Sequence, residues 1–292
     1  MKKIIFVADY YMDEFLGGAE LSTEALIKEC PYEFLKFKSS EVTADLIEEH
    51  RDEYWIFGNF TFVSEGSLKK ITDECRYSVL DHDFKLCDHR CPEVHKFKTG
   101  NECNCCNPVI IGFYTNAEYV FFMSKRQMDW SIKQLPFMNA VLLTTPFARD
   151  TLQIFRDMRE QIKDQKRNGK WIILFSDSWV KGSKEAVRYA LANDLDYEII
   201  YKKPYIEVLI ALSQAEGYIY MPAGSDICPR AVTEAKLLGC KLLINDYVLQ
   251  REESWFDTDD GDAIITFLES RLGFFWGKIN EQIEDAMGNK TA

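Results

Sequence analysis

The chain has 292 residues, of which 47% are hydrophobic and 14% aromatic; this composition excludes a disordered protein, and the length favours two domains. Its formal net charge of −12, from 35 basic and 47 acidic residues, disfavours nucleic acid or an anionic membrane as a partner. No apolar run approaches the roughly 18 residues that a membrane span needs. The apolar run after Met1 ends at Asp9, too early for a signal peptide, so we expect a cytoplasmic protein. Nine cysteines, an odd number, argue against a disulfide framework.

In the first half, short apolar segments alternate with amphipathic ones, as in a parallel α/β sheet. The predicted strands are residues 3–8, 53–57, 77–80, 117–123 and 140–144, with helices near 21–26 and 127–132. Gly17 and Gly18 precede the first of these helices, and His82 follows the third strand almost directly. Glycines let a backbone approach a ligand closely, and a helix N-terminus favours an anion. Ligands of such sheets bind at the carboxyl ends of strands, so these positions are candidate binding residues.

The segment from Cys87 to Cys106 contains five of the nine cysteines and two of the four histidines. Thiolate and imidazole ligands at tight spacing suit a closed tetrahedral zinc site. Any four of six residues could supply the ligands: Cys87, Cys91, His95, Cys103, Cys105 and Cys106. The spacing matches neither a regular pair of Cys-x2-Cys motifs nor a common iron–sulfur run. A structural zinc is therefore predicted, and a reduced, metal-free surface loop is the alternative.

The second half repeats the alternation of strands and helices after a charged helix and linker at 149–169. Strands are predicted at 170–175, 197–201, 216–221 and 241–245, and helices at 205–213, 229–238, 263–272 and 276–287. A further helix is expected to begin with Ser183 as its cap. Pro229 and Gly239 mark the start and end of the helix at 229–238. Asp226 lies in the loop before this helix and Glu234 lies on it, with seven residues between them.

The pattern Asp226-x7-Glu234, with Gly239 five residues after the Glu, resembles the Glu-x7-Glu signature of retaining glycosyltransferases of the GT-B fold, family 4 type. The resemblance implies an α/β protein with two Rossmann-like, doubly wound domains that face each other across a cleft. These would be an acceptor-side domain, residues 1–150, with the Cys/His insert at 82–107, and a nucleotide-sugar-binding domain, residues 151–273. The closing helix, 274–288, would pack back on the first domain.

The resemblance also implies an activity. A hexosyl or pentosyl group would pass from a nucleotide-sugar donor to a glycan, lipid, protein or small-molecule acceptor, with retention of anomeric configuration. No catalytic metal is expected, because the family neutralises the leaving diphosphate with cationic side chains and a helix N-terminus.

Site roles follow from the same resemblance. Gly17 and Gly18 are similar to the family's first loop, which faces the donor phosphates, and His82 to the His that contacts the donor sugar. Lys181, followed by Gly182, resembles the Lys that neutralises the diphosphate. Glu234 suits the ribose hydroxyls and Asp226 those of the donor sugar.

The chain departs from the family pattern at two places. Asp226 stands where the family usually has Glu, and Asp177 and Ser178 stand where an Arg usually precedes the Lys. We expect Arg230, at the start of the signature helix, to replace that cation. The departures leave two alternatives to a transferase: a non-catalytic nucleotide-sugar-binding protein, and an interaction protein organised by the Cys/His insert. A transferase acting on DNA is disfavoured by the net charge.

Overall fold

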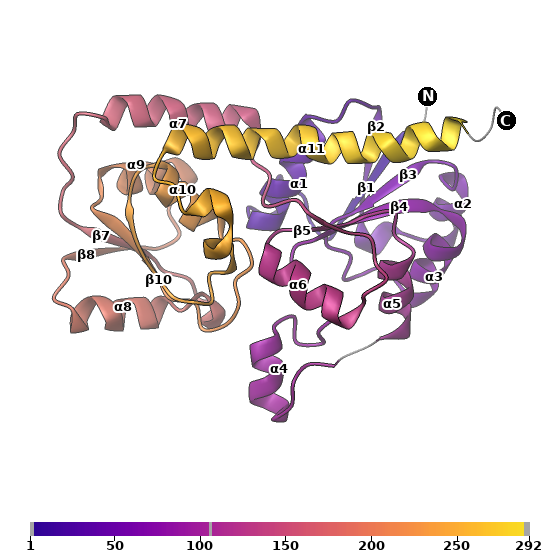
Figure 1. Cartoon of the computed structure of the whole chain (residues 1–292), viewed down its shortest axis with the longest axis horizontal. Coiled ribbons are helices and arrows are strands. Elements are labelled where there is room, and N and C mark those ends of the chain that lie inside the picture. The colour runs from indigo at the N-terminus through magenta and orange to yellow at the C-terminus, as the bar shows by residue number, and fades with distance from the viewer. Residues whose placement is uncertain (1–2, 105–106, 289–292) are drawn as a thin grey trace. The chain divides into compact units, whose positions relative to one another are not determined.

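The computed structural model describes residues 3–104 and 107–288 (Figure 1). The chain forms two compact units. The first comprises the residues up to Ala148 together with those from Leu268 onward, and the second is Arg149–Phe267. None of the described helices is both long and apolar enough to cross a membrane.

The first unit is built on a six-stranded sheet of order β2-β1-β3-β4-β5-β6, with every neighbouring pair parallel. The strands are β1 (Ile4–Ala8), β2 (Phe34–Lys38), β3 (Tyr54–Phe57), β4 (Arg76–Asp81), β5 (Val120–Phe122) and β6 (Ala140–Leu142). The helices are α1 (Gly18–Lys28), α2 (Ala44–Glu49), α3 (Glu65–Glu74), α4 (Pro92–Thr99), α5 (Pro108–Thr115) and α6 (Lys125–Gln134).

Both faces of this sheet are covered, which explains why its central strands are apolar without alternation. Ile5 and Val7 of β1 lie in a core that includes Phe113 of α5. Phe6 points the other way, and its ring lies 6.2 Å from that of Trp276. The pleat therefore sends successive side chains of one strand into two different layers.

The second unit is built on a four-stranded parallel sheet of order β10-β9-β7-β8. Its strands are β7 (Trp171–Leu174), β8 (Tyr197–Ile200), β9 (Gly217–Tyr220) and β10 (Lys241–Ile244). Its helices are α7 (Arg149–Ile162), α8 (Ser183–Ala192), α9 (Tyr205–Gln214) and α10 (Arg230–Leu237). Helix α8 covers one face of the sheet, and α9 and α10 cover the other (Figure 1). The two parallel sheets confirm the predicted α/β class.

The C-terminal segment is one continuous helix, α11 (Gly261–Gly288), and the prediction of two helices separated near residue 273 is wrong. Gly273 lies in the helix interior, where a glycine weakens a helix without ending it. Buried side chains recur on both sides of it, at Leu268, Leu272, Phe275 and Ile279. This uninterrupted buried stripe outweighs the low helix propensity of a single glycine.

Three smaller expectations also need correction. Strand β2 was not predicted, because its exposed and half-buried residues include Lys36 and Lys38. The Cys/His segment contains helix α4, although its sequence shows no helical period. Ser183 does not cap α8; Gly182 precedes the helix, and the Ser183 hydroxyl instead accepts a hydrogen bond from the amide of Ser176 at 2.9 Å.

Candidate functional site

The order of the second sheet defines where a ligand is expected to bind. Strand β7 lies between β8 and β9, so the chain leaves it towards one side and returns on the other. In doubly wound sheets ligands bind at the carboxyl ends of strands at this switch point. The loops that follow β7 and β9 carry Lys181 and Asp226.

Lys181 and Asp226 form a direct ion pair at this switch point. The Lys181 Nζ donates to Asp226 Oδ2 at 2.6 Å, and the hydroxyl of Tyr220, the last residue of β9, donates to the same oxygen. The lysine side chain is 44% exposed and that of the aspartate 14%. Backbone bonds from Asp226 N to Tyr247 O and from Leu249 N to Asp226 O fix the position of the acid. A partly exposed cation thus lies against a carboxylate that the backbone holds in place.

Gly182 allows these two loops to meet. Its φ is +61°, and a Cβ at this position would overlap the carbonyl of Met221, just after β9. The amide of Ala223 also donates to Val180 O at 2.9 Å. Only glycine combines the left-handed backbone with this close approach, so Gly182 determines where Lys181 lies.

Glu234 and Arg230 form a second, buried pair on α10. Glu234 is 4% exposed and Arg230 7%, and Arg230 Nε lies 3.7 Å from Glu234 Oε1. The hydroxyl of Tyr205, the first residue of α9, donates to the same oxygen at 2.9 Å. Burial raises the pKa of Glu234, while the Arg230 charge and the Tyr205 hydrogen bond act in the opposite direction. Arg230, expected to bind phosphate, is therefore engaged with Glu234.

Gln250 fixes the start of α10 and was not predicted from the sequence. Its Nε2 donates to Pro229 O at 3.1 Å, and its Oε1 accepts from Thr233 Oγ1 at 3.1 Å and from Cys228 Sγ at 2.8 Å. Fully buried, Gln250 ties the loop that carries Asp226 to the helix that carries Glu234.

Asp177, at the position where the resemblance implied an Arg, has partners of its own. Asp177 accepts from the Tyr201 hydroxyl at 2.8 Å and pairs with Lys202 Nζ at 3.1 Å. The Tyr201 hydrogen bond, and then Lys202, lower the pKa of this exposed carboxyl. Asp177 also lines a cavity of about 320 Å³ beside Ser176, Ser183 and Lys184. Lys202 is a cation near this loop that the sequence analysis missed.

In the first unit, His82 lies just after β4 among buried charged groups. Its Nε2 lies 3.4 Å from Thr23 Oγ1 of α1. Burial, followed by the positive charge of Lys85, lowers the pKa of His82 to about 3. The imidazole is therefore neutral at pH 7 and can exchange hydrogen bonds with hydroxyl groups.

Lys85 is buried and was not recognised in the sequence. Its Nζ donates to Asn59 Oδ1 at 3.0 Å and lies 3.5 Å from Asp81 Oδ1 and 3.3 Å from Asp83 Oδ1. Burial raises the pKa of Asp81, and Lys85 opposes that shift. Asp81, Asp83 and Lys85 lie within five residues of the chain, and Asn59 joins them from the end of the neighbouring strand β3.

Gly17 and Gly18, the predicted phosphate-binding glycines, lie at the start of α1 beside acidic side chains. Gly17 precedes α1, whose first residue is Gly18. The buried carboxylate of Glu20 contacts the space beside Gly17, and burial raises the pKa of this acid, with a further contribution from Asp9. Two carboxylates near this helix end disfavour an anion there and favour hydroxyl groups.

The structure brings together three of the six predicted metal ligands. Cys87, His95 and Cys103 are buried, and their ligand atoms lie within 4.8 Å of one another. Cys91 is buried as well, and its Sγ donates to Glu93 Oε2 at 3.2 Å. Cys105 and Cys106 lie outside the described residues.

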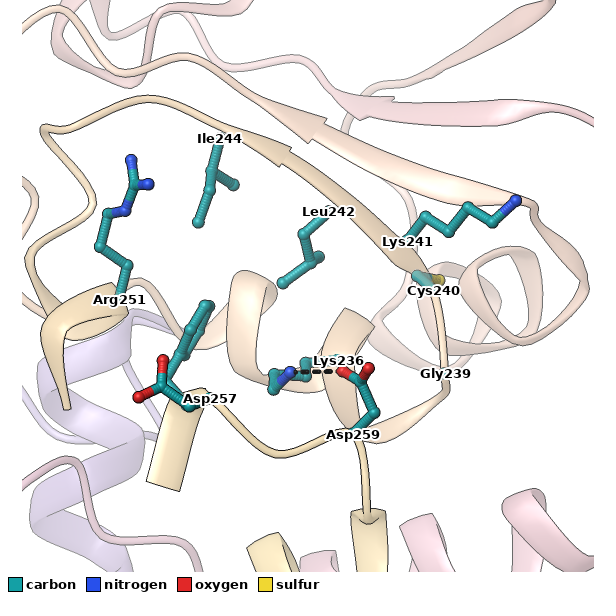
Figure 2. Close-up of a pocket in the computed structure, with 10 residues that line it drawn as sticks. Lys236, Gly239, Cys240, Lys241, Leu242, Ile244, Arg251, Asp257 and Asp259 are labelled. Carbon is teal, nitrogen blue, oxygen red and sulfur yellow. Dashed lines mark hydrogen bonds and ion pairs between the residues drawn. The ribbon is translucent and has the colours of Figure 1, made fainter. Parts of the chain in front are cut away.

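A separate cavity of about 650 Å³ runs along the edge strand β10 (Figure 2). Lys236 and Asp259 pair across it at 3.0 Å, and Leu242, Ile244 and Arg251 also line it. It contains none of the predicted site residues, and its charged groups are mixed in sign.

Comparisons with known proteins find similar structures but no protein with a similar sequence. No family model matches the chain, and no curated protein matches its sequence. Among solved structures, HepE (Alr3699) of Anabaena in complex with UDP and glucose is 11% identical, with a TM-score of 0.54, covering 99% of this chain and 100% of that one. A UDP-forming α,α-trehalose-phosphate synthase of Burkholderia xenovorans is 9% identical, with a TM-score of 0.54 and 96% coverage of both chains. The same HepE has also been solved with UDP-glucose, at a TM-score of 0.52.

The chain therefore has the fold of GT-B glycosyltransferases, as the sequence predicted.

Proposed function

We propose that the chain is a glycosyltransferase that uses a nucleotide-sugar donor, bound in the second unit at the switch point between β7 and β9. The observation that carries the proposal is the pair of Lys181 and Asp226, one cation and one acid placed where such sheets bind ligands. The similar structures solved with UDP and with UDP-glucose support a donor of this class.

The pair suggests how the donor would be held. Cleavage of a nucleotide sugar develops negative charge on the leaving diphosphate, which a nearby cation stabilises. We assign this role to Lys181, whose exposed side chain can exchange Asp226 for a phosphate. Asp226 would then accept hydrogen bonds from hydroxyls of the donor sugar. Transfer of a hexosyl or pentosyl group with retention would use a leaving-group oxygen to take the acceptor proton.

Glu234 and Arg230 are assigned to the nucleotide side of the donor. A ribose hydroxyl would replace or join Tyr205 as a hydrogen-bond partner of Glu234. Arg230 would influence the phosphates through its charge near the start of α10. In the first unit, the neutral His82 and the acidic surroundings of Gly17 and Gly18 suit sugar hydroxyls rather than phosphate. We assign this unit, with its insert at 82–107, to acceptor binding. We further propose that the protein acts in the cytoplasm.

A non-catalytic nucleotide-sugar-binding protein is the second candidate, and Asp177 favours it. An acid at the usual position of an Arg weakens the charge that stabilises a leaving diphosphate. The two candidates differ in turnover: a transferase or a donor hydrolase releases nucleoside diphosphate, whereas a binding protein does not.

Donor binding is testable by calorimetry and thermal shift with UDP, UDP-glucose and the corresponding guanosine and adenosine compounds. A ligand that binds only the folded chain raises its melting temperature. Replacing Lys181 by Ala should weaken diphosphate binding about tenfold or more, since a charged hydrogen bond contributes about 1.5–3 kcal/mol. Lys241→Ala, an exposed lysine on β10 paired with Glu216, is the matched control and should bind normally. If no nucleotide sugar or nucleoside diphosphate binds, the proposed function is wrong.

A further inference from the structure

We propose that Cys87, His95 and Cys103 bind a structural zinc ion. Their three ligand atoms lie within 4.8 Å of one another. In tetrahedral zinc sites, bonds of about 2.3 Å to sulfur and about 2.0–2.1 Å to nitrogen separate the ligand atoms by roughly 3.5–3.8 Å. Side-chain movements of about 1 Å would therefore close the group around an ion.

The local backbone brings these residues together from one helix and two turns. Cys87 ends a turn after β4, with its amide donating to Phe84 O at 2.9 Å. His95 lies on α4, one helical turn after Cys91. Gly100, at φ +74°, ends this helix in the left-handed conformation and lets the chain turn back, so that Cys103 reaches His95. A helix and two turns thus bring these three residues together, whereas the spacing in the sequence did not show which of the six candidates would meet.

Apolar burial gives this segment little reason to be ordered. His95 is the single buried residue of α4, and Phe97 on the same helix is 90% exposed. Ordering a segment of this kind has an entropic cost that needs another source of stabilisation. Two thiolates and an imidazole bound to zinc would supply it, because metal binding and local folding are linked.

The site also has a consequence for the end of β4. Arg90, between Cys87 and Cys91, donates from Nη1 to Asp83 Oδ1 at 3.0 Å, and its amide donates to Cys87 O at 2.8 Å. A metal that fixes Cys87 therefore also fixes the residues that hold Asp83, next to His82. The inference is independent of the proposed function, because it concerns metal content and local order.

Elemental analysis of the full chain, purified without a metal-chelating tag from zinc-supplemented cells, tests the site. We expect about one zinc per chain. Cys87→Ser, His95→Gln and Cys103→Ser should each lose most of it and become sensitive to protease within residues 87–104. Cys30→Ser and Cys75→Ser, two half-buried cysteines elsewhere in this unit, are matched controls and should keep the metal. Zinc retained equally by all variants would be bound elsewhere and would overturn the proposal.

A second measurement covers variants that fail to fold. A mercurial thiol reagent added to the native protein should release zinc to a coloured indicator, and protein loaded with Co²⁺ should show a thiolate-to-metal absorption band. A native protein that takes up neither ion after reduction, or one in which mass spectrometry finds a Cys87–Cys103 disulfide, would contradict the site.

Discussion

Replacing Glu234 by Gln should destabilise the second unit, because it removes the carboxylate charge that lies beside the buried guanidinium of Arg230. The side chain of Arg230 is 7% exposed and that of Glu234 is 5% exposed, and Arg230 Nε lies 3.7 Å from Glu234 Oε1. At an effective dielectric constant of about 20 their attraction is roughly 4–5 kcal/mol. Part of it is offset by the desolvation of both groups, and breaking such a pair from one side typically costs about 3–5 kcal/mol. We expect about 3 kcal/mol, since Gln can still accept from Tyr205.

The partner variant should behave differently. Arg230→Met leaves a carboxylate that can take up a proton, whereas the guanidinium in Glu234→Gln cannot lose one. Burial holds the pKa of Glu234 above its ordinary 4.5, so the folded state binds the proton more tightly than the unfolded state. The contribution of this group to stability therefore rises as the pH falls towards 4.5. Arg230→Met should recover stability between pH 7 and pH 5, and Glu234→Gln should not.

Urea unfolding of both single variants and of the double variant Arg230→Met/Glu234→Gln completes the cycle. The double variant should be more stable than the sum of the two single losses by at least about 1 kcal/mol. Additive losses, or a Glu234→Gln protein as stable as the native one, would refute the buried pair. Nucleotide affinity is then compared at a temperature where every variant is folded, which separates the proposed binding role of Glu234 from its structural one.

Three further predictions concern single positions. His82, with its pKa lowered to about 3 by burial, binds a proton less readily when folded, so stability is lost as the pH falls from 6.5 towards 3, by up to about 4 kcal/mol; His82→Gln should flatten this part of the urea stability profile. Gly182→Ala should cost more than about 3 kcal/mol through its left-handed backbone and the overlap with Met221, whereas Gly169→Ala, at φ +79° with open space around it, should lose only about 1–2 kcal/mol. Gly273→Ala, in open space inside α11, should raise the melting temperature, because alanine favours a helix by about 1 kcal/mol.

The outcomes that would contradict these predictions are specific. If the free energy of unfolding of His82→Gln depended on pH as it does in the native chain, a group other than His82 would cause the loss of stability in acid. Equal losses for the two glycine variants would mean that the loop can move away from Met221. A destabilised Gly273→Ala would indicate that α11 is not continuous in solution.

Most strands of this chain were readable from its sequence, because buried parallel strands are apolar runs, and Pro229 and Gly239 marked the helix between them. Helices α2, α3 and α5 were not predicted. Edge strand β2 was missed, since a half-exposed strand containing lysines lacks that signal. The continuity of α11 was missed because the segment around Gly273 was interpreted as a break between two helices. Local propensity was overridden there by tertiary packing.

The candidate site was only partly readable. The motif pointed to Asp226 and Glu234, the family resemblance to Lys181, and the absent Arg to Arg230, but none of them showed that the four residues form one partly exposed and one buried pair. The pair of Lys181 and Asp226 depends on which strands are neighbours, and that order does not follow from local patterns. Arg230 and Glu234 are four residues apart on one helix, and what the sequence did not show is that this pair is buried. Gln250 and Tyr205 were missed because their partners are distant in sequence. Lys85 was missed although Asp81 and Asp83 are close to it in sequence, because its burial depends on how the ends of β3 and β4 pack.

The contact between Lys181 and Asp226 has a consequence for competing ions. Inorganic phosphate or pyrophosphate that captured the lysine would leave a carboxylate, 14% exposed, beside a new negative charge. At separations near 4 Å such repulsion amounts to roughly 4 kcal/mol at an effective dielectric constant of about 20. A ligand with hydroxyl donors next to its phosphates avoids this cost, because it satisfies the acid and the lysine together. If Lys181 binds the donor phosphates as proposed, the pair would discriminate against small anions by repulsion rather than by shape.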